Sequence, residues 1–140
     1  AGVHFRHENA KSAHAPGFYL HLAPGEVFMG AGIWRPETAV TREIRAAILE
    51  HPDKWKKDIR SAAFTKGGFS LDGESLKRPP AGVEADHPFI EDLKRKDFIS
   101  LADLSEKEVC APGFPKLFAD KCKSTSAFVK FLCEAVGQPY

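Results

Sequence analysis

The stretch GFYLHLAPGEVFMGAGIW, residues 17–34, consists of two apolar runs separated by Pro24-Gly25, and it predicts a β-hairpin. A loop of two or four residues would place three apolar pairs on one face: Leu22 with Val27, Leu20 with Met29, and Phe18 with Ala31. A three-residue loop would mix apolar and polar side chains on both faces, which a buried face strongly disfavours. We therefore expect the three apolar pairs to face the core.

The opposite face of this hairpin has a different character. Its residues are Tyr19, His21, Phe28, Gly30, Gly32 and Trp34. Two interpretations of its glycines stay open: a packed helix or a bulge requires them, or they form the floor of a ligand site. In the second interpretation Tyr19 and His21 supply polar contacts, while Phe28 and Trp34 form the side walls.

Apolar residues recur at helical spacing in several later segments. The expected helices span residues 37–50 with Pro36 in the first turn, residues 52–64, and one or two helices over 115–136 with a break at 124–126. Two shorter helices are expected, one beginning near Pro88 with Asp86 or His87 as its cap, and one opened by a capping box of Ser105 and Glu108.

Strand signals complete the predicted architecture. The run FISLADL, residues 98–104, predicts a strand, and Asp72-Gly73 between short apolar segments predicts a second hairpin. Together these elements predict an α+β fold, in which helices pack mainly on one face of an antiparallel sheet built from hairpins. With 140 residues, the chain is expected to form a single domain.

Composition excludes several function classes. The formal net charge is +1, from 20 basic and 19 acidic residues, so we expect no general attraction to nucleic acid or to a membrane surface. No stretch approaches the roughly 20 apolar residues of a membrane helix, and no signal-peptide pattern is present, so a cytoplasmic protein is expected. The odd set of three cysteines, without a CxxC pair, is expected to remain as free thiols.

Basic residues suggest a ligand for the polar hairpin face. If Arg6, Arg35 and the Lys77-Arg78 pair converge there, the site would suit a small anion such as a phosphate or a carboxylate. Each of these side chains could equally be a solvated surface cation. The competing function is a structural or interaction domain, whose aromatic hairpin face meets another chain or a further N-terminal region of the protein.

Catalytic and metal-binding signals are weak. Tyr19 and His21 are the candidates for moving protons or orienting a ligand, but common catalytic signatures such as GxSxG and HExxH are absent. His4 and His7 are weak metal candidates, because no carboxylate or cysteine stands at a ligand spacing from them, and no metal is predicted. A small enzyme and a metabolite-binding module fit equally well, and the sequence indicates neither a cofactor nor an oligomeric state.

Three motifs, in order along the chain, carry a family resemblance: PGFYLHLAPGEVFMGAGIWRPE, LDGESLKRPPAGVEADHPFIEDLKRKDF and LSEKEV. From about His4 to the C-terminus the chain resembles a bacterial and fungal family known as domain of unknown function 2461. The resemblance implies a single α+β domain and assigns no activity. It also implies a further N-terminal region with an Arg-Asp, Arg-Phe, Asp-Lys, Pro-Tyr signature. The motifs that carry the resemblance include Gly30, Gly32, Arg35, Lys77, Arg78 and His87.

Overall fold

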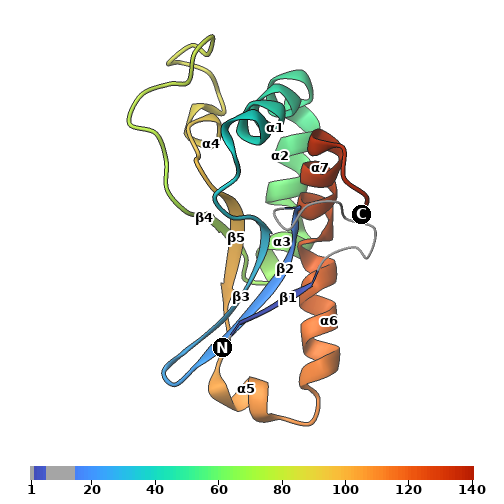
Figure 1. Ribbon diagram of the computed structural model, residues 1–140. Helices are drawn as coiled ribbons and strands as arrows, with labels where there is room; N and C mark the ends of the chain where they lie inside the picture. Colours follow the sequence, from blue (N-terminus) through green and yellow to red (C-terminus); the bar gives the residue numbers. More distant parts are fainter. Residues whose placement is uncertain (1, 6–14) are drawn as a thin grey trace.

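The protein has an α+β fold built on an antiparallel sheet whose strands differ in length (Figure 1). The computed structural model describes residues 2–5, with only the backbone for residues 3–5, and residues 15–140. The described strands are β1 (Gly2–Phe5), β2 (Gly17–Ala23), β3 (Glu26–Ile33), β4 (Ser70–Asp72) and β5 (Phe98–Asp103). They lie in the order β1-β2-β3-β5-β4, and every neighbouring pair is antiparallel. The predicted fold class is confirmed.

The hairpin of β2 and β3 has the predicted register. Ala23 pairs with Glu26, so the loop consists of Pro24 and Gly25 alone. Gly25 has a φ of +75°, a left-handed conformation that glycine adopts without steric cost. The three expected apolar pairs are formed. Met29 is fully buried and Leu20 is 7% exposed, which confirms that this face packs in the core.

Helices gather along one side of the sheet (Figure 1). Their bounds are α1 (Thr38–Glu50), α2 (Pro52–Arg60), α3 (Ala62–Lys66), α4 (Ile90–Leu93), α5 (Glu106–Cys110), α6 (Phe114–Ser124) and α7 (Ser126–Val136). The capping box of Ser105 and Glu108 opens α5 as predicted. The predicted break between the last two helices falls at Thr125, whose buried hydroxyl lies 3.0 Å from Oγ of Ser100 on β5.

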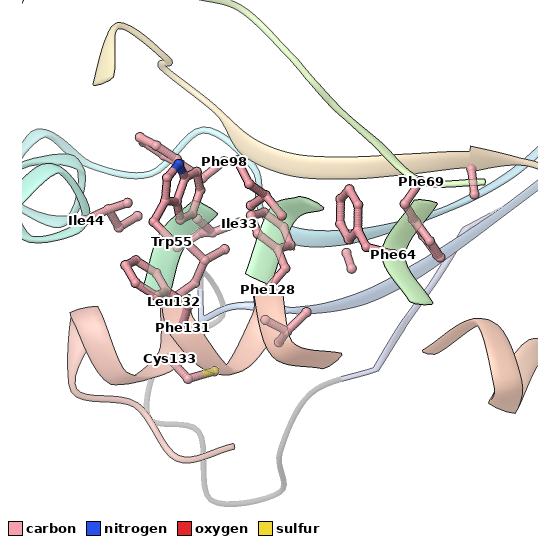
Figure 2. Packing of buried hydrophobic residues seen from close by; sticks show 14 of the residues in the cluster. Ile33, Ile44, Trp55, Phe64, Phe69, Phe98, Phe128, Phe131, Leu132 and Cys133 are labelled. Carbon is pink, nitrogen blue, oxygen red and sulfur yellow. The ribbon is translucent and has the colours of Figure 1, made fainter. Parts of the chain in front are cut away.

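Aromatic side chains from the helices fill the space beneath the sheet (Figure 2). The Trp55 ring on α2 lies 5.9 Å from the Phe128 ring and 5.1 Å from the Phe131 ring, both on α7, measured between ring centroids. Trp55 and Phe128 are fully buried. The indole N–H of Trp55 donates to Oδ2 of Asp92 at 3.0 Å, which satisfies the polar atom that this buried ring carries.

The predicted second hairpin is wrong. Ser70 to Asp72 pairs with β5 instead of folding back on the residues that follow Gly73. The chain only bends at Gly73, which has a φ of +105°, and continues in the same direction, where Ser75 forms an isolated antiparallel bridge with Arg95, ahead of β5. The Asp72-Gly73 signal therefore marks a bend and not a reversal of the chain, and the partner strand lies far along the chain.

Three helix predictions also need correction. Residues 52–64 form two helices rather than one, because the Ser61 hydroxyl accepts the backbone N–H of Phe64 and so caps a new helix. Pro36 precedes the N-cap of α1 instead of lying in its first turn. The short helix α4 begins at Ile90, near Pro88 as predicted, but its N-cap is Phe89 instead of Asp86 or His87, and Nδ1 of His87 accepts the Phe89 N–H at 3.0 Å.

Candidate functional site

The face of the sheet opposite the core carries a pocket of about 660 Å³, which we call the sheet-face pocket. The described residues that line it are Ala15, Gly17, Phe18, Tyr19, His21, Phe28, Gly30, Ala31, Gly32, Ile33, Trp34, Ile99 and Leu101. They come mainly from β2, β3 and β5, the central strands of the sheet. All six residues predicted for the second face of the hairpin are among them, so the strand register brings that set together.

The two glycines of this face serve different purposes. A Cβ at Gly32 would lie 2.1 Å from the carbonyl oxygen of Phe98, and the residue has a φ of +124°, so the close approach of β3 to β5 requires glycine there. A Cβ at Gly30 would lie 2.9 Å from the terminal Cδ2 of the Leu101 side chain, which can move. Gly32 is therefore needed by the sheet itself, and Gly30 is the position that opens the pocket floor.

Aromatic rings form the wall of the sheet-face pocket nearest the hairpin loop. The rings of His21 and Phe28 are stacked, with centroids 4.7 Å apart and planes 17° apart. The Tyr19 ring lies 6.1 Å from that of Phe28 and 6.3 Å from that of His21. At the other end of β3, Trp34 is 48% exposed. The pocket thus presents flat apolar surfaces, which suit a planar ligand.

His21 is the polar centre of this wall. Its Nδ1 lies 3.3 Å from the Tyr19 hydroxyl, and its Nε2 lies 3.8 Å from Oε2 of the exposed Glu26. Within the described part of the chain, Nε2 of His21 is a buried side-chain atom without a hydrogen-bond partner. When the Tyr19 hydroxyl donates to Nδ1, a neutral imidazole carries its proton on Nε2. That N–H then has no acceptor among the described residues.

The predicted basic residues lie elsewhere. The described lining of the sheet-face pocket contains neither Arg35 nor Lys77 nor Arg78. Lys77 and Arg78 are exposed in the segment after β4, and Arg6 lies outside the described residues. Arg35 lines a second pocket of about 460 Å³. The structure therefore separates these cations from the aromatic face, at least as far as the chain is described.

The second pocket, which we call the β3-end pocket, lies where the chain leaves β3. It is lined by Arg35, Pro36, Thr38, Thr41, Arg45, Glu74, Leu76, Lys96 and Asp97. Asp97, 5% exposed, holds it together: its carboxylate accepts the backbone N–H of Arg35 at 2.7 Å and that of Glu74 at 3.1 Å. Sequence reasoning missed Arg45 and Lys96, because no local pattern indicates that they meet Arg35.

The described residues give no support to metal binding. They contain no group of three or more His, Cys, Asp or Glu side chains placed to share an ion. The backbone of His4 pairs with Tyr19 in the sheet, its side chain is not described, and His7 lies outside the described residues. Cys110, Cys122 and Cys133 are free thiols, as expected. Burial raises the pKa of both the Cys122 and the Cys133 thiol to about 11, which opposes nucleophilic chemistry at these two residues.

Comparisons with known proteins agree with the motifs. In the described part of the chain, no helix has the length and apolar character needed to cross a membrane. Neither the comparison with curated proteins nor that with solved structures found a match. A family model described as a conserved hypothetical protein, DUF2461, matches residues 1–131. The chain therefore belongs to the DUF2461 family.

Proposed function

We propose that the sheet-face pocket binds a small, planar, mainly apolar molecule that accepts a hydrogen bond from His21. The observation that carries this proposal is the buried Nε2 of His21, which lacks a hydrogen-bond partner among the described residues and belongs to a ring that lines the pocket. A buried donor without a partner costs about 1–3 kcal/mol, so an acceptor brought by a ligand would recover that free energy. The stacked rings of His21 and Phe28 offer a flat surface to the body of the ligand.

The charges around the pocket favour a neutral acceptor over an anion. Its described lining includes no Lys or Arg side chain. The carboxylate of Glu26 lies 3.8 Å from Nε2 of His21, so it would repel an anionic group that approached the same nitrogen. A carbonyl or amide oxygen meets no such repulsion. Tyr19 has a positioning role when its hydroxyl donates to Nδ1, because that bond leaves the imidazole proton on Nε2.

A matched pair of probes tests both the site and its preference. 2-Naphthamide and 2-naphthoate share a planar apolar body and differ in the charge of the polar group. Binding is followed by the indole N–H signals in ¹H–¹⁵N NMR spectra, because Trp34 is 48% exposed at the pocket whereas Trp55 is fully buried in the core. We expect the amide to shift the Trp34 signal, to leave the Trp55 signal in place, and to bind more tightly than the carboxylate.

Two variants locate the binding. His21→Phe keeps an aromatic ring against Phe28 but removes Nε2, and it should weaken amide binding about fivefold, the value of one neutral hydrogen bond. Gly30→Ala adds a methyl group to the pocket floor and should also weaken it. Gly113→Ala is the matched control, because a Cβ at Gly113 meets no atom within 4 Å.

Two results would overturn the proposal. One is amide binding that neither His21→Phe nor Gly30→Ala weakens. The other is the absence of any probe binding together with self-association of the protein in sedimentation experiments. Loss of that self-association in a Trp34→Ser variant would support the interaction domain as the function of this face, since exposed aromatic residues are typical of such surfaces.

A further inference from the structure

We propose that the β3-end pocket is a second site, which binds the phosphate group of a small molecule. This inference goes beyond the proposed function, because the residues that carry it do not line the sheet-face pocket. Three cationic side chains from three separate segments contribute to its lining: Arg35 after β3, Arg45 on α1, and Lys96 before β5. A tetrahedral phosphate can accept hydrogen bonds from several directions at once, as such an arrangement requires.

The three cations lack carboxylate partners. Among the described residues, no acidic side chain lies within ion-pair distance of Arg35, Arg45 or Lys96. The side chains of Arg35 and Lys96 are exposed and able to reorient toward a ligand. Unpaired cations that share a pocket repel one another, and an anion placed between them removes that repulsion.

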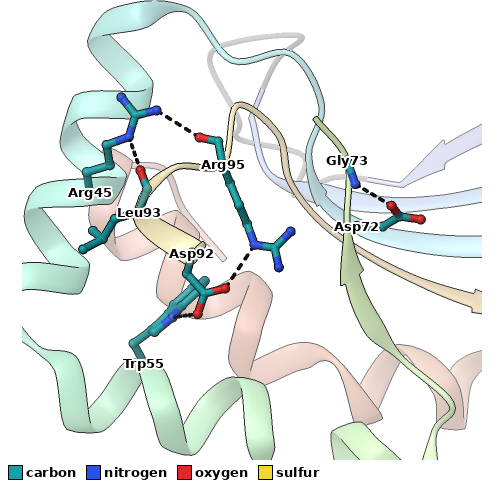
Figure 3. A network of polar contacts seen from close by, with 7 residues as sticks. All are labelled: Arg45, Trp55, Asp72, Gly73, Asp92, Leu93 and Arg95. Carbon is teal, nitrogen blue, oxygen red and sulfur yellow. Dashed lines mark hydrogen bonds and ion pairs between the residues drawn. The ribbon is translucent and has the colours of Figure 1, made fainter. Parts of the chain in front are cut away.

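Arg45 is already held in place for such a contact (Figure 3). Its Nε donates to the Leu93 carbonyl oxygen at 2.7 Å, and one terminal nitrogen donates to the Arg95 carbonyl oxygen at 3.0 Å. A guanidinium has five N–H donors, so these two bonds to neutral acceptors leave three donors and the full positive charge. The side chain therefore loses little further conformational freedom when a ligand binds.

The acidic residues of the pocket leave one positive charge in excess. Its lining includes Glu74 and Asp97 against three cations. The Asp97 carboxylate is buried and accepts two backbone N–H groups, so its oxygens are directed at the protein backbone. Thr38 and Thr41 bring the start of α1 to the same pocket, and no side chain caps that helix. The positive end of the helix dipole adds to the attraction for an anion.

The test is a titration of the protein with inorganic phosphate at constant ionic strength, followed by ¹H–¹⁵N NMR. We expect saturable shifts of the backbone amides in residues 35–45 and 94–97, and smaller effects with acetate. Arg35→Asn removes one charge and keeps a residue type that tolerates the left-handed backbone at this position, where φ is +49°. Lys96→Gln removes a second charge from an exposed position.

Each variant should weaken phosphate binding about tenfold, the usual value of one charge-assisted hydrogen bond. Arg42→Gln is the control, because it removes an exposed charge from α1, the helix that carries Arg45, at a position outside the pocket, and it should change the affinity less than twofold. Either of two results would overturn the proposal: the absence of saturable shifts in the parent protein, or equal losses in Arg42→Gln and Arg35→Asn. Acetate binding as tight as phosphate binding would overturn the assignment to phosphate.

Discussion

The two faces of the β2–β3 hairpin show how one pair of strands serves two purposes. On the covered face, Met29 is fully buried and packs with the helices, and Leu20 and Ala31 lie beside it. On the other face, alternate residues of the same strands are aromatic or glycine and line a pocket of about 660 Å³. The covered face contributes most to stability, because it removes apolar area from water. The open face leaves some of that area available for binding.

The largest expected effect is the stability loss on substitution of Gly32, which is compared with the loss at Gly30, the other glycine of the open face. Gly32→Ala should destabilise the protein by about 4 kcal/mol, since backbone strain and overpacking each cost roughly 1–3 kcal/mol. Its Cβ would lie 2.1 Å from the Phe98 carbonyl oxygen, whereas a Cβ at Gly30 first meets a mobile side chain. Gly30→Ala should therefore cost about 1 kcal/mol. Urea unfolding of both variants checks this, and equal losses would contradict the distinction.

The next effect compares neighbours that point to opposite faces. Met29→Ala removes a fully buried side chain from the core and should cost about 3 kcal/mol. Phe28→Ala, one residue earlier, removes a larger side chain from the partly exposed wall of the pocket and should cost about 1 kcal/mol. The measurement is again urea unfolding, with thermal unfolding as a check. A greater loss for Phe28→Ala would mean that something other than a small ligand covers the open face.

A smaller effect concerns the pH dependence of the covered side. Burial, followed by the charge of Glu134, raises the pKa of the Cys133 thiol in the folded protein to about 11. Because the unfolded thiol ionises near pH 9, the folded state keeps its proton longer, and this contribution to stability is present below pH 9 and lost as the pH rises toward 11. At pH 10 the loss should be about 1 kcal/mol.

The measurement for this prediction is the free energy of unfolding at pH 8 and pH 10, in the parent and in Cys133→Ala. The substitution leaves a small cavity that lowers stability equally at both pH values. The parent should therefore lose about 1 kcal/mol more than the variant between them. Identical pH dependence in the two proteins would show that the thiol is not protected by the core.

Local patterns predicted the hairpin because its geometry is decided within the segment itself. The turn at Pro24-Gly25 and the alternation of side chains together allow only one register that buries an apolar face. The pairing of β4 was not predictable in this way, since its partner β5 lies about 30 residues along the chain. The Asp72-Gly73 signal marks a bend rather than the predicted turn, and it contained no information about the strand that would pair with β4.

The residues of the two pockets differ in the same way: local pattern predicts those of one pocket, and contacts distant in sequence place those of the other. The residues of the aromatic face were identified together because they alternate along two paired strands. Arg35 follows the strand by two residues, but its destination depends on Asp97, which accepts its backbone N–H from 62 positions away. That contact and the positive φ direct the chain toward α1 and the β3-end pocket. Local pattern therefore indicated a basic residue but not the pocket to which it belongs.

The smallest expected effect is a gain in stability when Arg35 is replaced by glycine. Within the described residues, Arg35 is a non-glycine residue with positive φ, which costs about 1–2 kcal/mol relative to glycine. Glycine also loses more backbone entropy on folding, by about 0.5–1 kcal/mol. Arg35→Gly should therefore stabilise the protein by about 0.5 kcal/mol in urea unfolding, and by the same reasoning Arg35→Ala should not stabilise it.

The stability gain of Arg35→Gly is interpreted together with the phosphate affinity of the same variant. If Arg35→Gly raises the free energy of unfolding and also lowers phosphate affinity, then arginine occupies a strained position at a net cost to stability, as expected of a binding residue rather than a structural one. If the variant is less stable than the parent, the Arg35 side chain contributes to the fold, and its place in the β3-end pocket has a structural explanation.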